Sequence, residues 1–277
     1  MGAADLTKIE TLTAQLRALG IRPGDALMAH VAMRELVPVE RGAAGVLAAL
    51  REAVGARGTL LFAVPCESSG SVFQADDRIR VASKLANAPG FDPKRGRPRG
   101  VLGDFPHAVL ADRDATIAAH PAMRYAAFGR LARKLLAKMP ADDPMGIGSP
   151  VDLLGASDGR ILVAGVDPWL VTAAHLAEYH ARPRGRMRVT RHYKTIEDGA
   201  PKFHTIHMID DWNSEFRHER AFAAAHGQRF ARKGPLGQGQ ATLYEAAPLV
   251  RFLAQRLAGP ELFRTVLRVG GPPPEAR

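Results

Sequence analysis

Residues 26–65 carry the pattern that most restricts the possible fold. Ala26–His30 is a short apolar run, Ala43–Val54 has the composition of a helix that stops at Gly55, and Gly58–Pro65 is apolar again. A strand, a helix and a strand over about 40 residues form a βαβ unit, in which the strands are parallel and the crossover is right-handed. The sequence therefore predicts an α/β fold.

A second strand and helix follow later in the chain. Arg160–Gly165 is typical of a buried strand, Thr172 is a favourable N-cap, and Ala173–Ala181 is rich in helix formers. We expect a central, mostly parallel sheet with flanking helices and a smaller attached α/β part. The active site should lie in a cleft between the two parts.

The remaining segments fit one domain over residues 1–277. Residues 187–208 alternate as a hairpin would, around Glu197–Gly199. Residues 66–100 read as long loops with a helix around 76–86, and loops of this length commonly have a functional role. We expect them to lie over the cleft. The Pro- and Gly-rich tail 270–277 is predicted to be disordered.

Composition narrows the class of protein. Hydrophobic residues make up 46% and charged residues 24% of the chain, which is typical of a globular protein with a sizeable core. No apolar run reaches the roughly 18 residues of a membrane span, and the N-terminus lacks a signal-peptide core. The one cysteine, Cys66, excludes an internal disulfide and fits a reducing compartment. We therefore expect a cytoplasmic protein with no membrane partner.

The net charge of +10 points to a partner that carries phosphates, either nucleic acid or a phosphorylated cofactor. A solvated basic surface is the alternative that needs no partner. Basic residues gather at 94–99 and 182–191. Neither cluster is interleaved with aromatic residues and no nucleic-acid-binding motif occurs, so nucleic acid is disfavoured.

His175 and Glu178 are three residues apart in the predicted helix after Gly165, so their side chains can meet on one face. A carboxylate beside an imidazole fixes its tautomer and raises its basicity, as a general base near neutral pH requires. The pair also follows the carboxyl end of a strand, where open α/β sheets bind ligands. An ordinary contact at the surface or core edge is the alternative reading.

Several short motifs occur in a fixed order along residues 6–258. They are Gly24–Arg34 (GDALMAHVAMR), Phe91–Pro93 followed by Gly103, His120–Gly129 (HPAMRYAAFG), Gly148–Pro150 with Leu153 and Leu154, Val163–Val166, and Thr172–Glu178 (TAAHLAE). Together they resemble the aminoglycoside 3-N-acetyltransferase family, also called the antibiotic N-acetyltransferase family. The ordered series is specific, although each motif alone is not.

The resemblance implies an acyltransferase of the antibiotic-resistance type. It implies acetyl-CoA as donor, a primary amine on a small molecule as acceptor, His175 as general base and Glu178 as its orienting partner. No metal is required by this chemistry, and no cluster with zinc-ligand spacing occurs. A homodimer is left open as the oligomeric state.

Residues 30–34 are the expected coenzyme contact, because backbone N–H groups after a strand suit a pyrophosphate. The contact set is His30, Val31, Ala32, Met33, Arg34 and Thr172. His30 could equally be a satisfied histidine at a strand end, and Thr172 a plain N-cap. Phe73 and Trp169 are candidates for the acceptor pocket, with core or loop anchors as the alternative.

The chain departs from the family pattern at three motifs. Val31–Ala32 replaces a Ser-Ser pair, Trp169–Ala173 replaces Asp-x-Asn-Thr-Ser except for its Thr, and Arg124 replaces a Ser. Residues 66–100 are also basic, which suits a polycationic aminoglycoside poorly. Three alternatives therefore stay open: a smaller, less cationic or anionic amine as acceptor, a drifted paralogue that binds coenzyme A or another phosphate ligand, and a basic nucleic-acid-binding protein.

Overall fold

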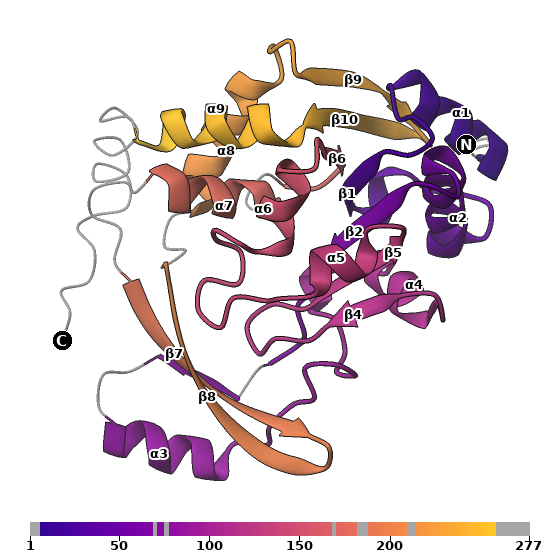
Figure 1. Ribbon diagram of the computed structural model, residues 1–277. Helices are drawn as coiled ribbons and strands as arrows, with labels where there is room; N and C mark the ends of the chain where they lie inside the picture. The colour runs from indigo at the N-terminus through magenta and orange to yellow at the C-terminus, as the bar shows by residue number, and fades with distance from the viewer. Residues whose placement is uncertain are drawn as a thin grey trace, which may run out of the picture.

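The larger part of the chain is a seven-stranded sheet with the order β4-β5-β2-β1-β6-β10-β9 (Figure 1). The computed structural model describes residues 6–68, 71–74, 78–167, 170–181, 188–209 and 214–258. The predicted disordered tail, 270–277, lies outside the described residues. The strands are β1 (Ala26–Val31), β2 (Thr59–Ala63), β4 (Thr116–Ala118), β5 (Tyr125–Gly129), β6 (Arg160–Ala164), β9 (Ala231–Leu236) and β10 (Gly239–Glu245).

The sheet is mixed. β1 is parallel to both of its neighbours, β2 and β6, whereas β2–β5, β4–β5, β6–β10 and β9–β10 are antiparallel. The predicted α/β class is confirmed, but the prediction of a mostly parallel sheet is wrong. The βαβ pattern accounts only for the centre, and short connections such as the one between β9 and β10 make antiparallel neighbours.

Helices cover both faces of this sheet. In β1, Leu27 and Ala29 belong to one core and Ala26 and Met28 to the other, and all six residues are buried, as a central strand between two helical layers requires. The first core also takes in α1 (Ile9–Ala18), α2 (Gly42–Val54) and α4 (Phe105–Ala111). The second takes in α5 (Ala132–Leu136), α6 (Pro150–Gly155), α7 (Thr172–Ala181), α8 (Ser214–Ala225) and α9 (Ala246–Ala258). Within the described ranges, no helix has the length and apolar composition needed to cross a bilayer.

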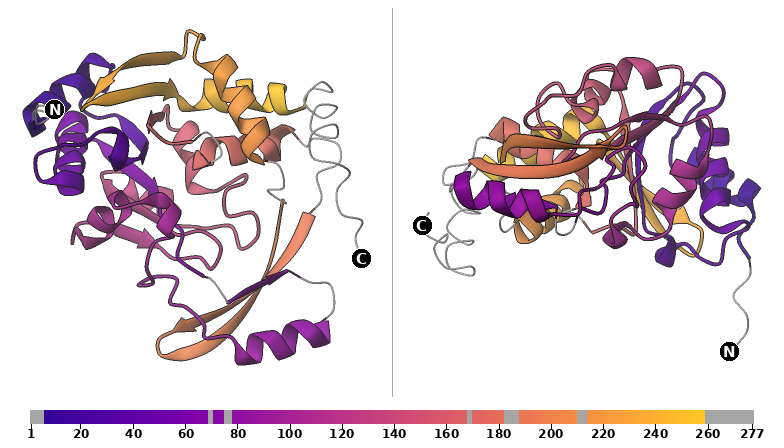
Figure 2. Two further views of the ribbon diagram at one scale, coloured as in Figure 1. Left: turned by 180° about the vertical axis from the view of Figure 1, so that it is seen from behind. Right: turned by 90° about the horizontal axis from the view of Figure 1, so that it is seen from below.

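A second, three-stranded sheet has the order β3-β7-β8 and forms the smaller part that the sequence predicts. It consists of β3 (Val72–Gln74), β7 (Arg188–Glu197) and β8 (Ala200–Ile209). The hairpin turn has positive φ at Asp198 (52°) and Gly199 (79°), the signature of a type I′ turn. The helix expected around 76–86 is α3 (Arg78–Asn87), which lies beside β3 and β7 (Figures 1 and 2).

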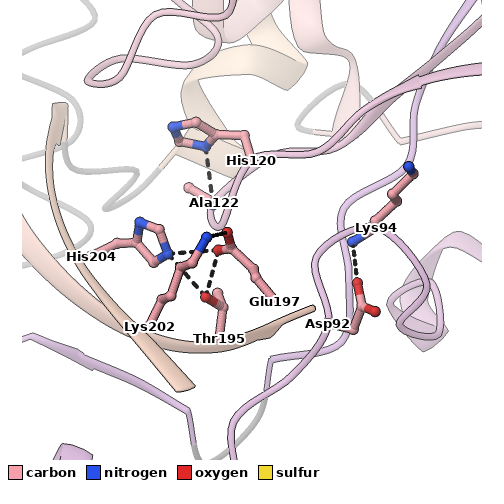
Figure 3. A network of polar contacts seen from close by, with 8 residues as sticks. All are labelled: Asp92, Lys94, His120, Ala122, Thr195, Glu197, Lys202 and His204. Atoms are coloured by element: carbon pink, nitrogen blue, oxygen red, sulfur yellow. Dashed lines mark hydrogen bonds and ion pairs between the residues drawn. The ribbon is translucent and has the colours of Figure 1, made fainter. Parts of the chain in front are cut away.

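The tip of the small sheet is held by a network that we call the hairpin cluster: Thr195, Glu197, Lys202 and His204 (Figure 3). Glu197 accepts hydrogen bonds from the Thr195 hydroxyl at 2.7 Å and from Lys202 at 3.0 Å, and His204 Nε2 lies 2.8 Å from its Oε1. These contacts, the Thr195 bond first, lower the pKa of Glu197 to about 2. The cluster thus favours the charged carboxylate.

We predict that Glu197→Gln lowers the free energy of unfolding at pH 7 by about 1 kcal/mol or less, since solvent screens this partly exposed cluster. The lowered pKa means that the wild-type contribution is complete above about pH 4.5 and is lost as the pH falls toward 2. Chemical denaturation measures the loss. The exposed Glu245, changed to Gln, is the control. An equal loss in both variants would contradict a specific role for the cluster.

Candidate active site

The carboxyl ends of β1 and β6 lie side by side, with His30 opposite Val163 and Val31 opposite Ala164. The helix that follows β1 packs on one face of the sheet and α7, which follows β6, packs on the other. Connections that leave neighbouring parallel strands toward opposite faces open a crevice between them, and α/β proteins bind ligands at such a switch point.

Gly165 makes the turn after β6 and has φ of +65°, a conformation that favours glycine. A Cβ built at this position would lie 2.3 Å from Cγ of Glu35. Glu35 belongs to the 3₁₀ helix η1 (Met33–Glu35), the segment that follows β1. A side chain at residue 165 would therefore collide with Glu35, and one of the two segments would have to shift.

Helix α7 begins at Thr172 itself, one residue earlier than predicted, so Thr172 is the first helical residue and not the cap. The structure brings His175 and Glu178 together: Nδ1 of His175 lies 3.7 Å from Oε2 of Glu178. This is ion-pair range but longer than a hydrogen bond. Only 15% of the His175 side chain and 2% of that of Glu178 are exposed. A buried carboxylate is thus adjacent to an imidazole that keeps some access.

His30 is buried at the end of β1, and its Nε2 has no hydrogen-bond partner within the described part of the chain. One ring nitrogen of His30 is thus free to bond a group from outside the described residues. Burial, and then the nearby His175, lower the pKa of His30 to about 4, so its imidazole is neutral at pH 7. Two imidazoles thus lie near one another, and one of them is held uncharged.

A pocket of about 660 Å³, part of it open to solvent, lies at this edge of the sheet. Four of the predicted coenzyme residues line it, namely His30, Val31, Ala32 and Arg34. Met33 packs against the first core instead, and Thr172 is buried outside the lining. His30 lines the pocket, whereas His175 is not part of the lining. His30 connects the two, because it also lies close enough to His175 to interact with its charge.

Arg34 lies at this pocket with 68% of its side chain exposed, and its Nε donates to Glu35 at 3.1 Å. Its charge is therefore partly balanced by its neighbour. Of the two predicted acceptor residues, Phe73 is a residue of β3 opposite His192, and its side chain is outside the description. Trp169 lies outside the described residues altogether.

Other pocket residues were not predicted from the sequence. They are mainly apolar and come from the end of β2, the 3₁₀ helix η2 (Gly100–Leu102), α4 and the turn after β6: Phe62, Val64, Val101, Leu102, Phe105 and Asp167. Phe62 and Val64 could have been found, because the carboxyl end of β2 must lie at the same edge as that of β1. Nothing in the sequence around Val101 and Leu102 indicates a pocket wall.

Among the described residues, no group of three or more His, Cys, Asp or Glu side chains is placed to hold a metal ion.

Comparison with known proteins decides the family. A family model described as aminoglycoside 3-N-acetyltransferase matches residues 28–258. The chain belongs to the aminoglycoside 3-N-acetyltransferase family. It is thereby an acyltransferase of the N-acetyltransferase class, and the resemblance seen in the motifs is confirmed. Two similar relatives are aminoglycoside N(3)-acetyltransferase III of Serratia marcescens, 30% identical over 89% of this chain and 96% of its own, and aminoglycoside N(3)-acetyltransferase VII of Streptomyces paromomycinus, 30% identical over 87% and 88%.

Solved structures of the family share the fold. A sisomicin-bound AAC-VIa structure has a TM-score of 0.82 and 28% identity, covering 92% of this chain and 98% of that one. A binary complex of AAC-IIIb with CoASH has a TM-score of 0.81 and 26% identity, covering 98% and 100%. The mixed sheet with a smaller attached part is thus the architecture of aminoglycoside 3-N-acetyltransferases.

The lowered pKa of His30 makes stability depend on pH. The unfolded state takes up a proton near pH 6.5 and the folded state only near pH 4, so stability is complete above 6.5 and is lost as the pH falls between these values. We predict that His30→Gln reduces the loss of unfolding free energy between pH 7.5 and 5 by about 2 kcal/mol relative to the wild type.

Urea denaturation at the two pH values measures this difference. His107→Gln, which changes an exposed histidine of α4, should keep the wild-type pH dependence. If His30→Gln loses as much stability as the wild type on acidification, His30 is not held neutral by the fold.

Proposed function

We propose that the chain transfers the acetyl group of acetyl-CoA directly to a primary amine of an aminoglycoside, with His175 as general base and Glu178 as its orienting partner. The observation that carries the proposal is the His175–Glu178 pair, which lies beside a neutral His30 and a pocket at the switch point. Family membership supports the reaction class, and the closeness of His175 and Glu178 supports their assignment as base and partner.

The pocket fits the donor. Its walls are mainly apolar, as the pantetheine arm requires, and the unpaired Nε2 of His30 offers a hydrogen bond to a polar group in or near the pocket. Arg34 adds positive charge at the same pocket, which suits a phosphate. The structure of AAC-IIIb with CoASH is of a relative with the same fold, and it supports coenzyme A as the ligand.

The main group that the protein must supply for this acetyl transfer is a general base. The coenzyme supplies the acetyl group as a thioester, and an amine that is protonated at neutral pH cannot attack it until a proton leaves. His175 accepts that proton, and the new C–N bond forms. The C–S bond then breaks and the second proton lost by the nitrogen passes to the sulfur, so that the coenzyme leaves as a thiol. Glu178 holds the His175 ring and stabilises its protonated form. The neutral His30 adds no competing positive charge.

The acceptor is the less constrained half of the proposal. The sisomicin complex of AAC-VIa and the names of the relatives favour an aminoglycoside. Asp167, a carboxylate that lines the pocket, suits a cationic amine. The basic segment 94–99 and the apolar replacement at 169–173 favour a smaller, less cationic amine as the second candidate. The base and donor are the same for both.

We predict that His175→Ala lowers kcat roughly 10²- to 10⁴-fold, the usual contribution of a general base. Glu178→Gln should lower it less, because the base remains and only its orientation is lost. The assay measures coenzyme A release with a thiol reagent against several aminoglycosides and small neutral and anionic amines. His180→Ala is the matched control, since it removes an exposed histidine from the same helix.

Each outcome has a distinct meaning. Turnover of an aminoglycoside that is lost in His175→Ala supports the proposal in full. Turnover of another amine alone keeps the mechanism and replaces the acceptor. Tight acetyl-CoA binding without turnover of any amine indicates a drifted paralogue, and full activity of His175→Ala rules out His175 as the base.

A further inference from the structure

Four cations gather in residues 94–99, which we call the basic loop: Lys94, Arg95, Arg97 and Arg99. All four are exposed, and none forms an ion pair with a residue that the structure describes. Asp92 is the nearest acid in the sequence, and its Oδ1 accepts the backbone N–H groups of Lys94 at 2.7 Å and Arg95 at 2.9 Å instead of forming an ion pair with their side chains. In Figure 3 the side chain of Lys94 extends away from this carboxylate.

Arg124 holds the basic loop in place through hydrogen bonds, and its side chain is completely buried. Its Nη1 donates to the carbonyls of Lys94 at 2.9 Å and Gly96 at 3.0 Å, and its Nε donates to that of Val64 at 3.0 Å. Its Nη2 has no hydrogen-bond partner among the described residues. Arginine stays protonated in proteins, so Arg124 is a buried positive charge. It is hydrogen-bonded to the backbone of the loop that carries the four exposed cations.

The basic loop leads directly into the wall of the pocket. Arg99 donates its N–H to the carbonyl of Pro65, and its own carbonyl accepts the N–H of Leu102, both at 3.0 Å. Leu102 and Val101 line the pocket, as does Val64, which holds Arg124. The unpaired cations therefore adjoin the pocket that the proposed function assigns to the donor.

We propose that the basic loop binds the phosphate groups of the coenzyme, with Lys94, Arg95 and Arg97 as the contacting side chains. The inference rests on the proposed function, since it assumes that the pocket takes the pantetheine arm. Clustered cations next to a low-dielectric protein interior create a strong positive potential, which attracts a polyanion. Guanidinium groups also pair with phosphate through two parallel hydrogen bonds. Arg99 is left out because its Nε donates to the carbonyl of Cys66 at 3.3 Å.

The test is calorimetric titration of coenzyme A into the wild type and into Lys94→Gln/Arg95→Gln/Arg97→Gln. We expect the Kd of the triple variant to rise roughly 10- to 100-fold at low salt, and its dependence on salt to flatten. Pantetheine, which has no phosphate, should bind both proteins equally. The control is Arg130→Gln/Arg133→Gln/Lys134→Gln, which removes the same charge from exposed residues at and after the end of β5.

Dephospho-coenzyme A, which lacks the 3′-phosphate, shows which phosphate is bound. The difference in Kd between the wild type and the triple variant vanishes with this ligand if the 3′-phosphate is the contact, and persists if the pyrophosphate is. An unchanged Kd for coenzyme A in the triple variant overturns the inference and leaves the proposed function intact. Equal weakening of coenzyme A and pantetheine, or weakening only toward an anionic amine acceptor, also overturns it. A wild type that binds no coenzyme A overturns the proposed function first.

Discussion

The parallel pairing of β1 with β6 is the constraint on which the candidate site depends. Both strands lie inside the sheet, and their side chains are shared between two helical layers. Because α2 and α7 leave toward opposite faces, the ends of the strands open instead of closing over one another. His30 is carried to that edge by β1, and His175 is carried there by the helix after β6. Gly165 keeps the two segments in contact, since a side chain there would meet Glu35.

Burial gives the two imidazoles different properties. His30 is deep enough that desolvation lowers its pKa to about 4, whereas His175 keeps partial access and has a buried carboxylate next to it. A charged His30 would repel a protonated His175, so holding His30 neutral removes a penalty on the proton transfer that the proposed base performs. The basic loop has the opposite character, because its charges stay exposed and unpaired where the polyanionic end of the donor would lie.

The local parts of this arrangement could be predicted from the sequence, and the non-local parts could not. The 3.6-residue period sets the meeting of His175 and Glu178, and the Asp198–Gly199 turn fixes the hairpin. The pairing of β2 with β5 and of β6 with β10 joins segments far apart in the chain, so tertiary packing decides its direction. In the sequence, Arg124 is notable only because it replaces a serine of the family pattern. Its three carbonyl partners become visible when the loop is folded over it.

A double-mutant cycle on His30 and His175 tests most directly whether the switch point forms one catalytic site. kcat/KM for acetyl transfer is measured in the wild type, His30→Gln, His175→Ala and the double variant. We predict that the two effects are not additive: once His175 is absent, losing His30 should lower kcat/KM little further, because the neutral imidazole serves the proton transfer at its neighbour. If the two losses in kcat/KM simply multiply, the two histidines act independently and do not form one catalytic site.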